Sequence, residues 1–336
     1  MSATGLRGKH LITWEDWSKN EIEKVLAIAR DLKTKFVTSE PHRLLQDKTL
    51  FMIFAEKSIH TRNAIAAGIS QLGGHAFELA SEKIPFSVDS NVKDTAVVIS
   101  RMGHGVACRN PRFGNGNKFL NELAKWASVP VLSLEDDIYH PIQALADLMT
   151  MQEYFGNNLR GFKVALSWAY ADSLLNPLSL PQSLLLLLTR FGIDVSLAMP
   201  EEFPLMEKIV HRARNNAQLN DSKLNVTDNM EEAFHFAHIV IPVNWGGYAW
   251  FEEYVDDNEH RARMKENLDK YRDWICNQQK MNLADPHVKY MHPLPVDRGK
   301  GTEEAVADGP VSLIYEQAEN QLHISKAIMA LTLGGK

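Results

Sequence analysis

A polar corner between an apolar run and a small-residue helix gives the first indication of chemistry. The run Leu50–Phe54 has the length of a buried strand, and the corner Ser58–Arg62 follows it. A helix with small side chains comes next and ends at Gly73. The free N–H groups of a first helical turn, together with the helix dipole, favour an anion such as phosphate. An ordinary βα turn with a capping serine and solvated charges explains the same residues, so this corner alone leaves both interpretations open.

Four more polar groups follow later apolar stretches of the chain. They are Arg109, His140 with Gln143, Asn244 with Trp245, and His292–Pro295. Taken singly, Arg109 is typical of a solvated loop charge, and His140 of a helix cap. In parallel α/β folds, ligands bind beyond the carboxyl ends of the strands. Five polar groups at five predicted strand ends therefore favour an active site.

Composition limits the function classes. With 336 residues the chain is too long for one compact core, so two domains are expected. The formal net charge of −6 argues against a general nucleic-acid binder. Cys108 and Cys276 are the two cysteines, and no Cys/His cluster indicates a metal site. The sequence contains neither a signal-peptide core nor a membrane-spanning apolar run, so we expect a cytoplasmic protein that does not enter the membrane.

Strands and helices that would position these groups alternate along the chain. A capping box at Ser18 and Glu21 opens the first helix. The predicted strands are Leu50–Phe54, His75–Leu79, Gly105–Cys108, Val129–Leu134, Phe162–Trp168, Ile193–Ala198, Leu224–Thr227, His238–Val243, His287–Met291 and Val311–Tyr315. The main predicted helices between them are Asp94–Met102, Leu120–Ala127, a helix from His140 to Phe155, Gln182–Phe191, Glu207–Asn215, Met230–Ala237, Asp256–Gln279 and Gln317–Leu333. This order predicts an α/β protein with two doubly wound parallel sheets and helices on both faces of each.

The motifs, in this order, resemble those of the aspartate/ornithine carbamoyltransferase family over nearly the whole chain. Ser58–Arg62 resembles the family's phosphate loop, and His140–Gln143 its His-Pro-x-Gln motif. His292–Pro295 resembles the late His-x-Leu-Pro motif. The resemblance implies the carbamoyltransferase fold, with residues 1–148 as the carbamoyl-phosphate-binding domain and residues 149–316 as the amino-substrate-binding domain. The C-terminal helix, residues 317–333, would pack back on the first domain.

The stretch Ser167–Ser183 is similar to the proline-rich loop of the knotted branch of this family. That branch contains the N-acetylornithine and N-succinylornithine carbamoyltransferases and oxamate-type carbamoyltransferases. The resemblance implies a backbone knot, in which the chain after Trp245 passes through the loop Leu174–Pro181. It also implies a homotrimer with shared active sites, in which Lys83 and Pro85 reach the neighbouring subunit.

The chemistry implied by the resemblance is attack of an amine on the carbonyl carbon of carbamoyl phosphate, with phosphate as the leaving group. The residues assigned to carbamoyl phosphate are Ser58, Ile59, His60, Thr61, Arg62, Arg109, His140, Gln143, Leu294 and Pro295. Within this set Thr61, Arg109, His140 and Gln143 would be catalytic, with His140 as a hydrogen-bond donor to the carbonyl oxygen. No metal and no organic cofactor is required for this reaction.

The acceptor is expected to be a small amine or amide of amino-acid or nitrogen metabolism. The residues assigned to it are Trp168, Asn244, Trp245, His292 and Arg298. Arg298 would bind a carboxylate through two parallel hydrogen bonds, and a solvated loop arginine beside Asp297 is the equally weighted alternative.

Three positions depart from the family pattern. Ile59 stands where the phosphate loop has threonine, His60 where it has its central arginine, and Pro85 where many members have glutamine. Loss of one charged donor removes roughly 1.5–3 kcal/mol of anion binding. These departures favour an alternative, a ligand-binding trimer of the same fold that has lost catalysis. A third hypothesis is a nucleotide-binding oxidoreductase, and the absence of a Gly-x-Gly-x-x-Gly motif after Trp168 argues against it.

Overall fold

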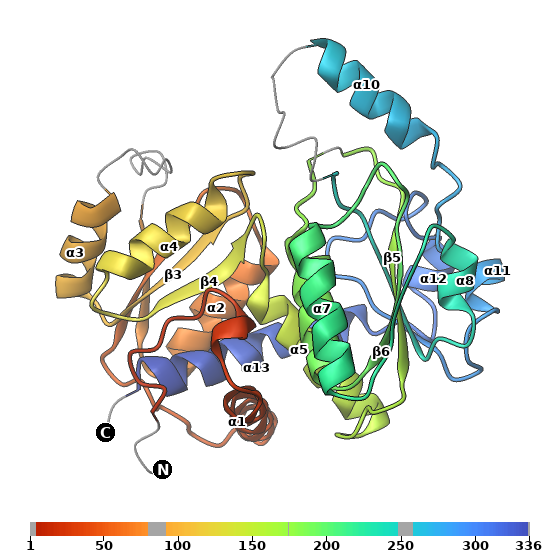
Figure 1. Cartoon of the computed structure of the whole chain (residues 1–336). Helices are drawn as coiled ribbons and strands as arrows, with labels where there is room; N and C mark the ends of the chain where they lie inside the picture. The colour runs from red at the N-terminus through yellow and green to blue at the C-terminus, as the bar shows by residue number, and fades with distance from the viewer. Residues whose placement is uncertain (1–4, 80–91, 174, 248–257, 335–336) are drawn as a thin grey trace. The chain divides into compact units, whose positions relative to one another are not determined.

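The computed structural model describes residues 5–79, 92–173, 175–247 and 258–334 (Figure 1). Two compact units divide the chain: the first holds the residues up to Met149 together with those from Ala318 on, and the second is Thr150–Gln317. Two parallel sheets with helices confirm the predicted fold class. Lys83, Pro85 and Leu174, which entered the trimer and knot predictions, lie outside the described residues.

The first unit is built on a four-stranded parallel sheet of order β2-β1-β3-β4. Its strands are β1 (Thr49–Phe54), β2 (His75–Glu78), β3 (Gly105–Asn110) and β4 (Val131–Asp136). Its helical elements are η1 (Trp14–Asp16), α1 (Lys19–Val37), α2 (His60–Gln71), α3 (Val92–Met102), α4 (Gly116–Trp126), the first part of α5 (Pro141–Phe155) and most of α13 (Ile314–Thr332). The strand order reverses between β1 and β3, so the loops after these two strands flank the crevice where such folds bind ligands.

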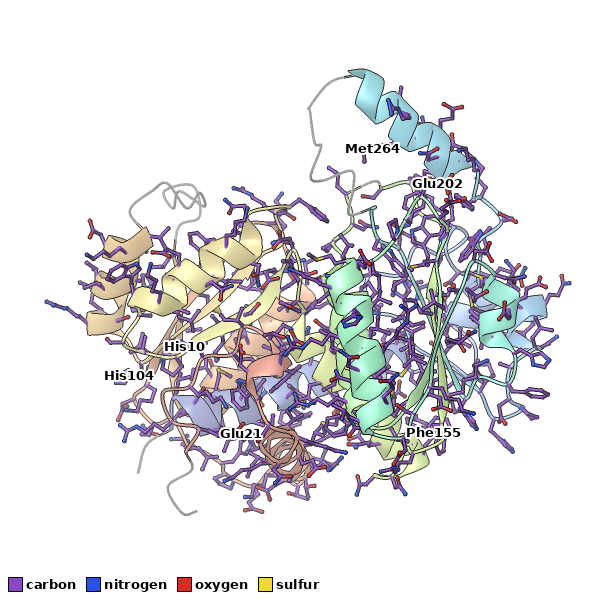
Figure 2. The ribbon with its side chains drawn as sticks, in the orientation of Figure 1. His10, Glu21, His104, Phe155, Glu202 and Met264 are labelled. Carbon is purple, nitrogen blue, oxygen red and sulfur yellow. The ribbon has the colours of Figure 1, made fainter. Side chains whose placement is uncertain are left out.

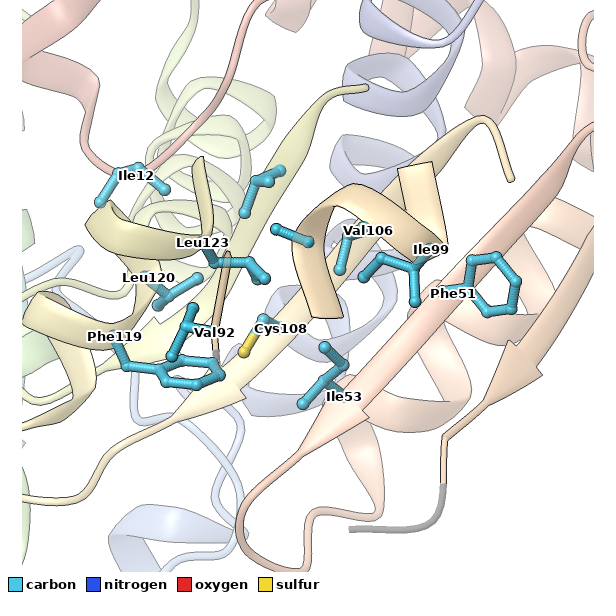
Figure 3. Packing of buried hydrophobic residues seen from close by; sticks show 12 residues of the cluster. Ile12, Phe51, Ile53, Val92, Ile99, Val106, Cys108, Phe119, Leu120 and Leu123 are labelled. Carbon is cyan, nitrogen blue, oxygen red and sulfur yellow. The ribbon is translucent and has the colours of Figure 1, made fainter. Parts of the chain in front are cut away.

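Helices cover both faces of this sheet (Figure 1). On the face of α3 and α4, apolar side chains such as Phe51, Val106 and Leu120 form one buried cluster (Figure 3). On the other face α2 lies against α13, where Gly68 allows close approach: a Cβ atom there would stand 3.0 Å from the Cε of Met329. Ser18 caps α1, and its side chain and that of Glu21 form the predicted capping box. The apolar faces of these helices therefore hold the sheet from both sides.

The second unit is built on a five-stranded parallel sheet of order β7-β6-β5-β8-β9. Its strands are β5 (Lys163–Trp168), β6 (Asp194–Ala198), β7 (Leu224–Thr227), β8 (Ile239–Val243) and β9 (Lys289–Tyr290). Its helices include α6 (Ser179–Arg190), α7 (Glu207–Leu219), α8 (Met230–Phe234), α10 (Asn258–Asp269), α11 (Gln278–Met281) and α12 (Glu304–Ala307). Helix α7 lies on one face of the sheet and α8 on the other (Figure 1). Here the strand order reverses between β5 and β8.

Three sequence predictions need correction. The strand predicted at Val311–Tyr315 is absent; Ser312 forms an isolated bridge to Tyr290, and α13 already begins at Ile314. Helix α6 begins at Ser179, three residues earlier than predicted, and takes Pro181 into its first turn, where proline is tolerated. In its described part, the insert predicted as one helix contains two, α10 and α11, with a turn between them.

No helix among the described residues combines the length and the apolar character needed to cross a membrane. The same residues contain no group of three or more His, Cys, Asp or Glu side chains placed to hold a metal ion.

Candidate active site

The predicted phosphate loop ends at the N-terminus of α2. The N-cap residue, Ile59, provides no side-chain hydrogen bond to the first turn, and its side chain is 73% exposed. His60 is the first helical residue and is exposed, whereas Thr61 is buried. Because the N-cap side chain forms no hydrogen bond to α2 and the first turn holds no acidic residue, the N–H groups of that turn can bind an anion.

Arg62 is directed to an acid of its own unit. Its Nη1 atom forms an ion pair with Glu78 Oε1 at 2.9 Å, and its guanidinium lies 4.7 Å from the centre of the Phe54 ring. Glu78 is the last residue of the edge strand β2. The contact between Arg62 and phosphate therefore stays a prediction, and it requires this ion pair to open or to be shared.

Arg109, Glu135 and His140 meet at the carboxyl ends of β3 and β4. Arg109 Nη2 donates to Glu135 Oε2 at 2.5 Å, and His140 Nε2 lies 3.8 Å from the same oxygen. Glu135 and His140 are buried, with 6% and 7% of their surface exposed. The Nε atom of Arg109 is also buried and has no hydrogen-bond partner among the described residues. The strand ends thus bring two predicted catalytic side chains together around one buried carboxylate.

His140 is held in its neutral form. Its pKa is lowered to about 4, chiefly by burial; the Glu135 carboxylate opposes this shift and the charge of Arg109 adds to it. A neutral imidazole donates one hydrogen bond and is not an acid of the strength of an imidazolium. This state fits the role predicted for His140, which is donation to a carbonyl oxygen.

A chain of hydrogen bonds links two other predicted catalytic residues through the C-terminal helix. Gln321 of α13 donates from Nε2 to Gln143 Oε1 at 3.1 Å and to Thr61 Oγ1 at 3.4 Å. Gln143 in turn donates from Nε2 to Asp147 Oδ1 at 2.6 Å. All four side chains are buried. This chain fixes Gln143 with its amide oxygen on the side of Thr61, which is the orientation needed to accept a hydrogen bond from an NH2 group.

In the second unit, the predicted acceptor residues Trp168 and Trp245 are both fully buried. Trp168 Nε1 donates to the main-chain oxygen of Trp245 at 2.8 Å, and Trp245 Nε1 to that of Phe203 at 2.9 Å. The Trp168 ring packs on Phe203, Tyr271 and Trp274. Because packing and internal hydrogen bonds engage both indoles, their contact with an acceptor stays a prediction that requires this aromatic cluster to open.

Asn244 joins the loops that follow β5 and β8. Its Nδ2 donates to the main-chain oxygen of Ala169 at 2.7 Å, and its Oδ1 accepts from Asn176 Nδ2 at 2.8 Å. Gly246 N–H donates to the main-chain oxygen of Asn176 at 3.0 Å. The proline-rich loop is therefore tied to the loop after β8, and the predicted threading of one through the other stays a prediction.

The late motif begins at His292, after β9. Burial lowers the pKa of His292 to about 4, so the ring is neutral. The peptide bond between Leu294 and Pro295 is cis. Arg298 donates from Nε and Nη2 to the two carboxylate oxygens of Asp308, at 2.8 and 2.6 Å. Arg298 thus uses its bidentate geometry on a carboxylate of the chain itself, and its contact with an acceptor carboxylate stays a prediction.

The predicted residues have partners that the sequence analysis did not identify: Glu78, Glu135, Asp147 and Gln321 in the first unit, and Asp308 in the second. An acid at the end of an otherwise apolar strand, Val131–Asp136, was the available signal for Glu135. Gln321 lies on a helix that was assigned to packing alone, and no spacing in the sequence connects it with Thr61 or Gln143.

Comparison with known proteins identifies relatives along the whole chain. Residues 9–153 match the family described as aspartate/ornithine carbamoyltransferase, carbamoyl-P binding domain, and residues 179–332 match the corresponding Asp/Orn binding domain. The ornithine carbamoyltransferase of Halalkalibacterium halodurans is 33% identical over 331 residues, which cover 98% of this chain and 97% of that protein.

Solved structures give the same result. The ornithine carbamoyltransferase of Pyrococcus furiosus has a TM-score of 0.87 at 31% identity and covers 99% of both chains. An acetylornithine transcarbamylase complexed with acetylcitrulline has a TM-score of 0.88 at 30% identity, covering 98% of this chain and 100% of the other. Sequence, fold and domain matches agree, and the chain belongs to the aspartate/ornithine carbamoyltransferase family.

Proposed function

We propose that the protein is an enzyme that transfers a carbamoyl group between carbamoyl phosphate and an amino or amide acceptor. Family membership supports this reaction. The main support from the site is that Arg109 and a neutral His140 lie close together at the ends of β3 and β4. Fixed donors of this kind stabilise negative charge that develops on a carbonyl oxygen during acyl transfer. Isotope transfer from carbamoyl phosphate to acceptors tests the proposal.

The steps follow from the positions of the donors. The acceptor nitrogen attacks the carbonyl carbon, and the carbonyl oxygen gains charge, which Thr61, Arg109 and His140 would stabilise by hydrogen bonds. Gln143, oriented by Gln321, would accept from the carbamoyl NH2 group. Leu294 and Pro295 would support the same group through their main-chain oxygens. The carbon–oxygen bond then breaks, the first-turn N–H groups of α2 hold the departing phosphate, and the phosphate can take the proton of the amine.

For the acceptor side we infer a carboxylate-bearing amine that uses Arg298. Such an acceptor competes with Asp308 for the guanidinium. Arg298→Ala should weaken acceptor binding about ten- to hundredfold, the size of one charge-assisted hydrogen bond, and should leave phosphate binding to the first unit unchanged. Asp308→Asn, the matched variant, should strengthen acceptor binding. Calorimetry with ornithine, N-acetylornithine and N-succinylornithine measures both, and unchanged acceptor affinity in Arg298→Ala would remove this role.

Ile59 and His60 favour a second candidate, a ligand-binding protein of the same fold without catalysis. The two candidates differ in what an arginine at position 60 does. If the loop still binds phosphate, His60→Arg introduces a guanidinium, a permanently charged group with several N–H donors, and should strengthen phosphate binding by about 1–2 kcal/mol. Calorimetric titration with phosphate and carbamoyl phosphate measures the change. Ile59→Thr, which restores a capping side chain without adding charge, is the control. Weak phosphate binding in both variants would support the second candidate.

We also propose a homotrimer with active sites shared between subunits, in the cytoplasm. Exposed apolar side chains support an interface on the first unit: Phe77 lies on the edge strand β2, and Val98 and Met102 lie on α3. Cys108 and Cys276 are free buried thiols, which fits a reducing compartment. The knotted branch remains part of the proposal, and the fold match to an acetylornithine transcarbamylase supports it.

A further inference from the structure

Three histidines use a ring nitrogen to bind the first main-chain N–H group of a neighbouring strand. His104 directly precedes β3, His238 directly precedes β8, and His10 lies in the N-terminal segment beside β4. The three bonds run from Thr49 N to His104 Nδ1 at 3.1 Å, from Lys163 N to His238 Nδ1 at 3.0 Å, and from Val131 N to His10 Nδ1 at 3.0 Å. Figure 2 labels His10 and His104 in the first unit. In each case the imidazole takes the place of a main-chain carbonyl in the sheet ladder.

In two of the three cases the bond is reciprocal. The main-chain N–H of His104 donates back to the oxygen of Thr49 at 2.8 Å, and that of His238 donates back to the oxygen of Lys163 at 2.8 Å. Each histidine therefore closes a two-bond ring with the first residue of the adjacent strand. At His10 the return bond comes from the next residue, since Leu11 N–H donates to the oxygen of Val131 at 2.9 Å. We call these three arrangements the histidine clamps.

The clamps join the strands that carry the candidate site. His104 connects β3 with β1, and His238 connects β8 with β5, which are the pairs where the strand order reverses in each sheet. Ligands in such folds bind at the opposite, carboxyl ends of those strands. The same strands end in the loop Ser58–Arg62, at Arg109 and at Asn244. The clamps thus fix, from the amino-terminal edge, the register of the strands that position the site.

A clamp exists only while its imidazole is neutral. A main-chain N–H can donate to Nδ1 only if that atom carries a lone pair, so the proton must be on Nε2. Protonation adds a proton to Nδ1, so that both ring nitrogens carry one. Nδ1–H and the main-chain N–H are then two donors that face each other, and the hydrogen bond is lost. All three rings are half-buried, so protons can reach them from solvent. Burial lowers the pKa of His10, and burial with the charge of Lys48 lowers the pKa of His104.

Each clamp has a lysine among its residues or next to one of them in the sequence. Lys48 faces His104, and Lys9, which is paired with Glu21, precedes His10. Lys163 is itself clamped by His238 and donates from Nζ to the main-chain oxygen of His235 at 2.7 Å. An additional positive charge on His104 would meet that of Lys48, which further disfavours protonation of this ring.

We propose that the histidine clamps form an acid-sensitive device that holds the site-bearing strands in register at neutral pH and releases their amino-terminal edges in acid. For His10 and His104, the direction in which pH changes stability follows from the difference in proton binding between the folded and the unfolded chain. Their folded-state pKa lies below the unfolded value, so the unfolded chain binds more protons in acid. The stabilisation is complete above about pH 6.5, the ordinary value for histidine, and is lost as the pH falls toward the folded-state pKa.

Asparagine provides a clamp that cannot titrate, because its Oδ1 occupies nearly the same position as histidine Nδ1 and accepts at every pH. Besides the loss that comes from the buried His140 and His292, the clamps at His10 and His104 should each contribute about a tenfold fall in the equilibrium constant for folding between pH 7.5 and pH 5, the size of one hydrogen bond. In the triple variant His10→Asn, His104→Asn, His238→Asn this contribution of the clamps should be largely absent. Denaturant unfolding at a series of pH values measures it. The exposed residues His75 and His211 supply matched His→Asn controls, which should keep the native pH dependence.

A second measurement uses the native chain and does not depend on the folding of a variant. Nitrogen NMR of labelled histidine distinguishes the two neutral tautomers. At pH 7.5 we expect the Nε2–H tautomer at His10, His104 and His238. An Nδ1–H tautomer at these positions, or an equal pH dependence of stability in the native chain and the triple variant, would overturn the proposal.

Discussion

Replacement of Arg109 by methionine should slow carbamoyl transfer by about 10²–10³-fold, the usual loss when one donor to a developing oxyanion is removed. Arg109 lies at the end of β3 beside His140, and its buried Nε atom has no hydrogen-bond partner in the part of the chain that the structure describes. Methionine keeps an unbranched chain as far as the position of Nε and removes every N–H group of the side chain. The measurement is the rate of acceptor-dependent release of phosphate from carbamoyl phosphate.

The same change leaves Glu135 buried without its cation. Removing one partner of a buried ion pair costs about 3–5 kcal/mol of stability, so a loss of activity could reflect unfolding. The double variant Arg109→Met, Glu135→Leu removes both charges and should regain most of the stability while remaining inactive. Recovery of transfer in the double variant would show that Arg109 only compensates Glu135 and does not act on the substrate.

Glu135→Gln should lower the stability of the folded chain and tighten its binding of phosphate. The amide keeps the size of the side chain but leaves Arg109 charged and uncompensated, so the free energy of unfolding should fall by about 3 kcal/mol. The released guanidinium can turn to an anion, and phosphate binding should become about ten- to hundredfold tighter. Thermal unfolding with and without phosphate, together with calorimetry, measures both effects.

Glu78→Gln supplies the matched control, because it removes the acid that pairs with Arg62, the other arginine assigned to carbamoyl phosphate. The Arg62–Glu78 pair is about one-third exposed on both sides. Pairs in that position contribute at most about 1 kcal/mol, so stability should change little. Equal losses of stability in the two variants would contradict the buried, site-forming position of Glu135.

The sequence was sufficient to predict the succession of strands and helices because most of them carry strong local signals. The capping box at Ser18, the apolar run Leu50–Phe54 and the nearly all-apolar helix after Pro181 are examples. The prediction failed at Val311–Tyr315. A short apolar run fits a strand or a buried helix start equally well, and only the structure shows that this run forms a single bridge, from Ser312 to Tyr290, before α13 begins at Ile314.

The candidate site residues were proposed from local sequence motifs. The residues that contact them in the structure could not be proposed in this way. Thr61, Arg109, His140 and Gln143 belong to local motifs of the first unit. Their partners Glu135 and Gln321 are reached only through folding, since Gln321 lies 260 positions after Thr61. The internal ion pair of Arg62 and the buried indoles of Trp168 and Trp245 also depend on tertiary packing, which composition and spacing do not contain.

The central claim is that the first unit positions Arg109 and His140 to transfer a carbamoyl group from carbamoyl phosphate. Its most direct test is incubation of the protein with carbon-labelled carbamoyl phosphate and a panel of amines and amides, including ornithine, N-acetylornithine and N-succinylornithine. The native chain should form a labelled, acid-stable ureido or acylurea product with at least one acceptor, in step with release of phosphate, and the Arg109→Met, Glu135→Leu variant should not. Absence of labelled product with every acceptor, or equal product formation by the native chain and the double variant, would contradict the account.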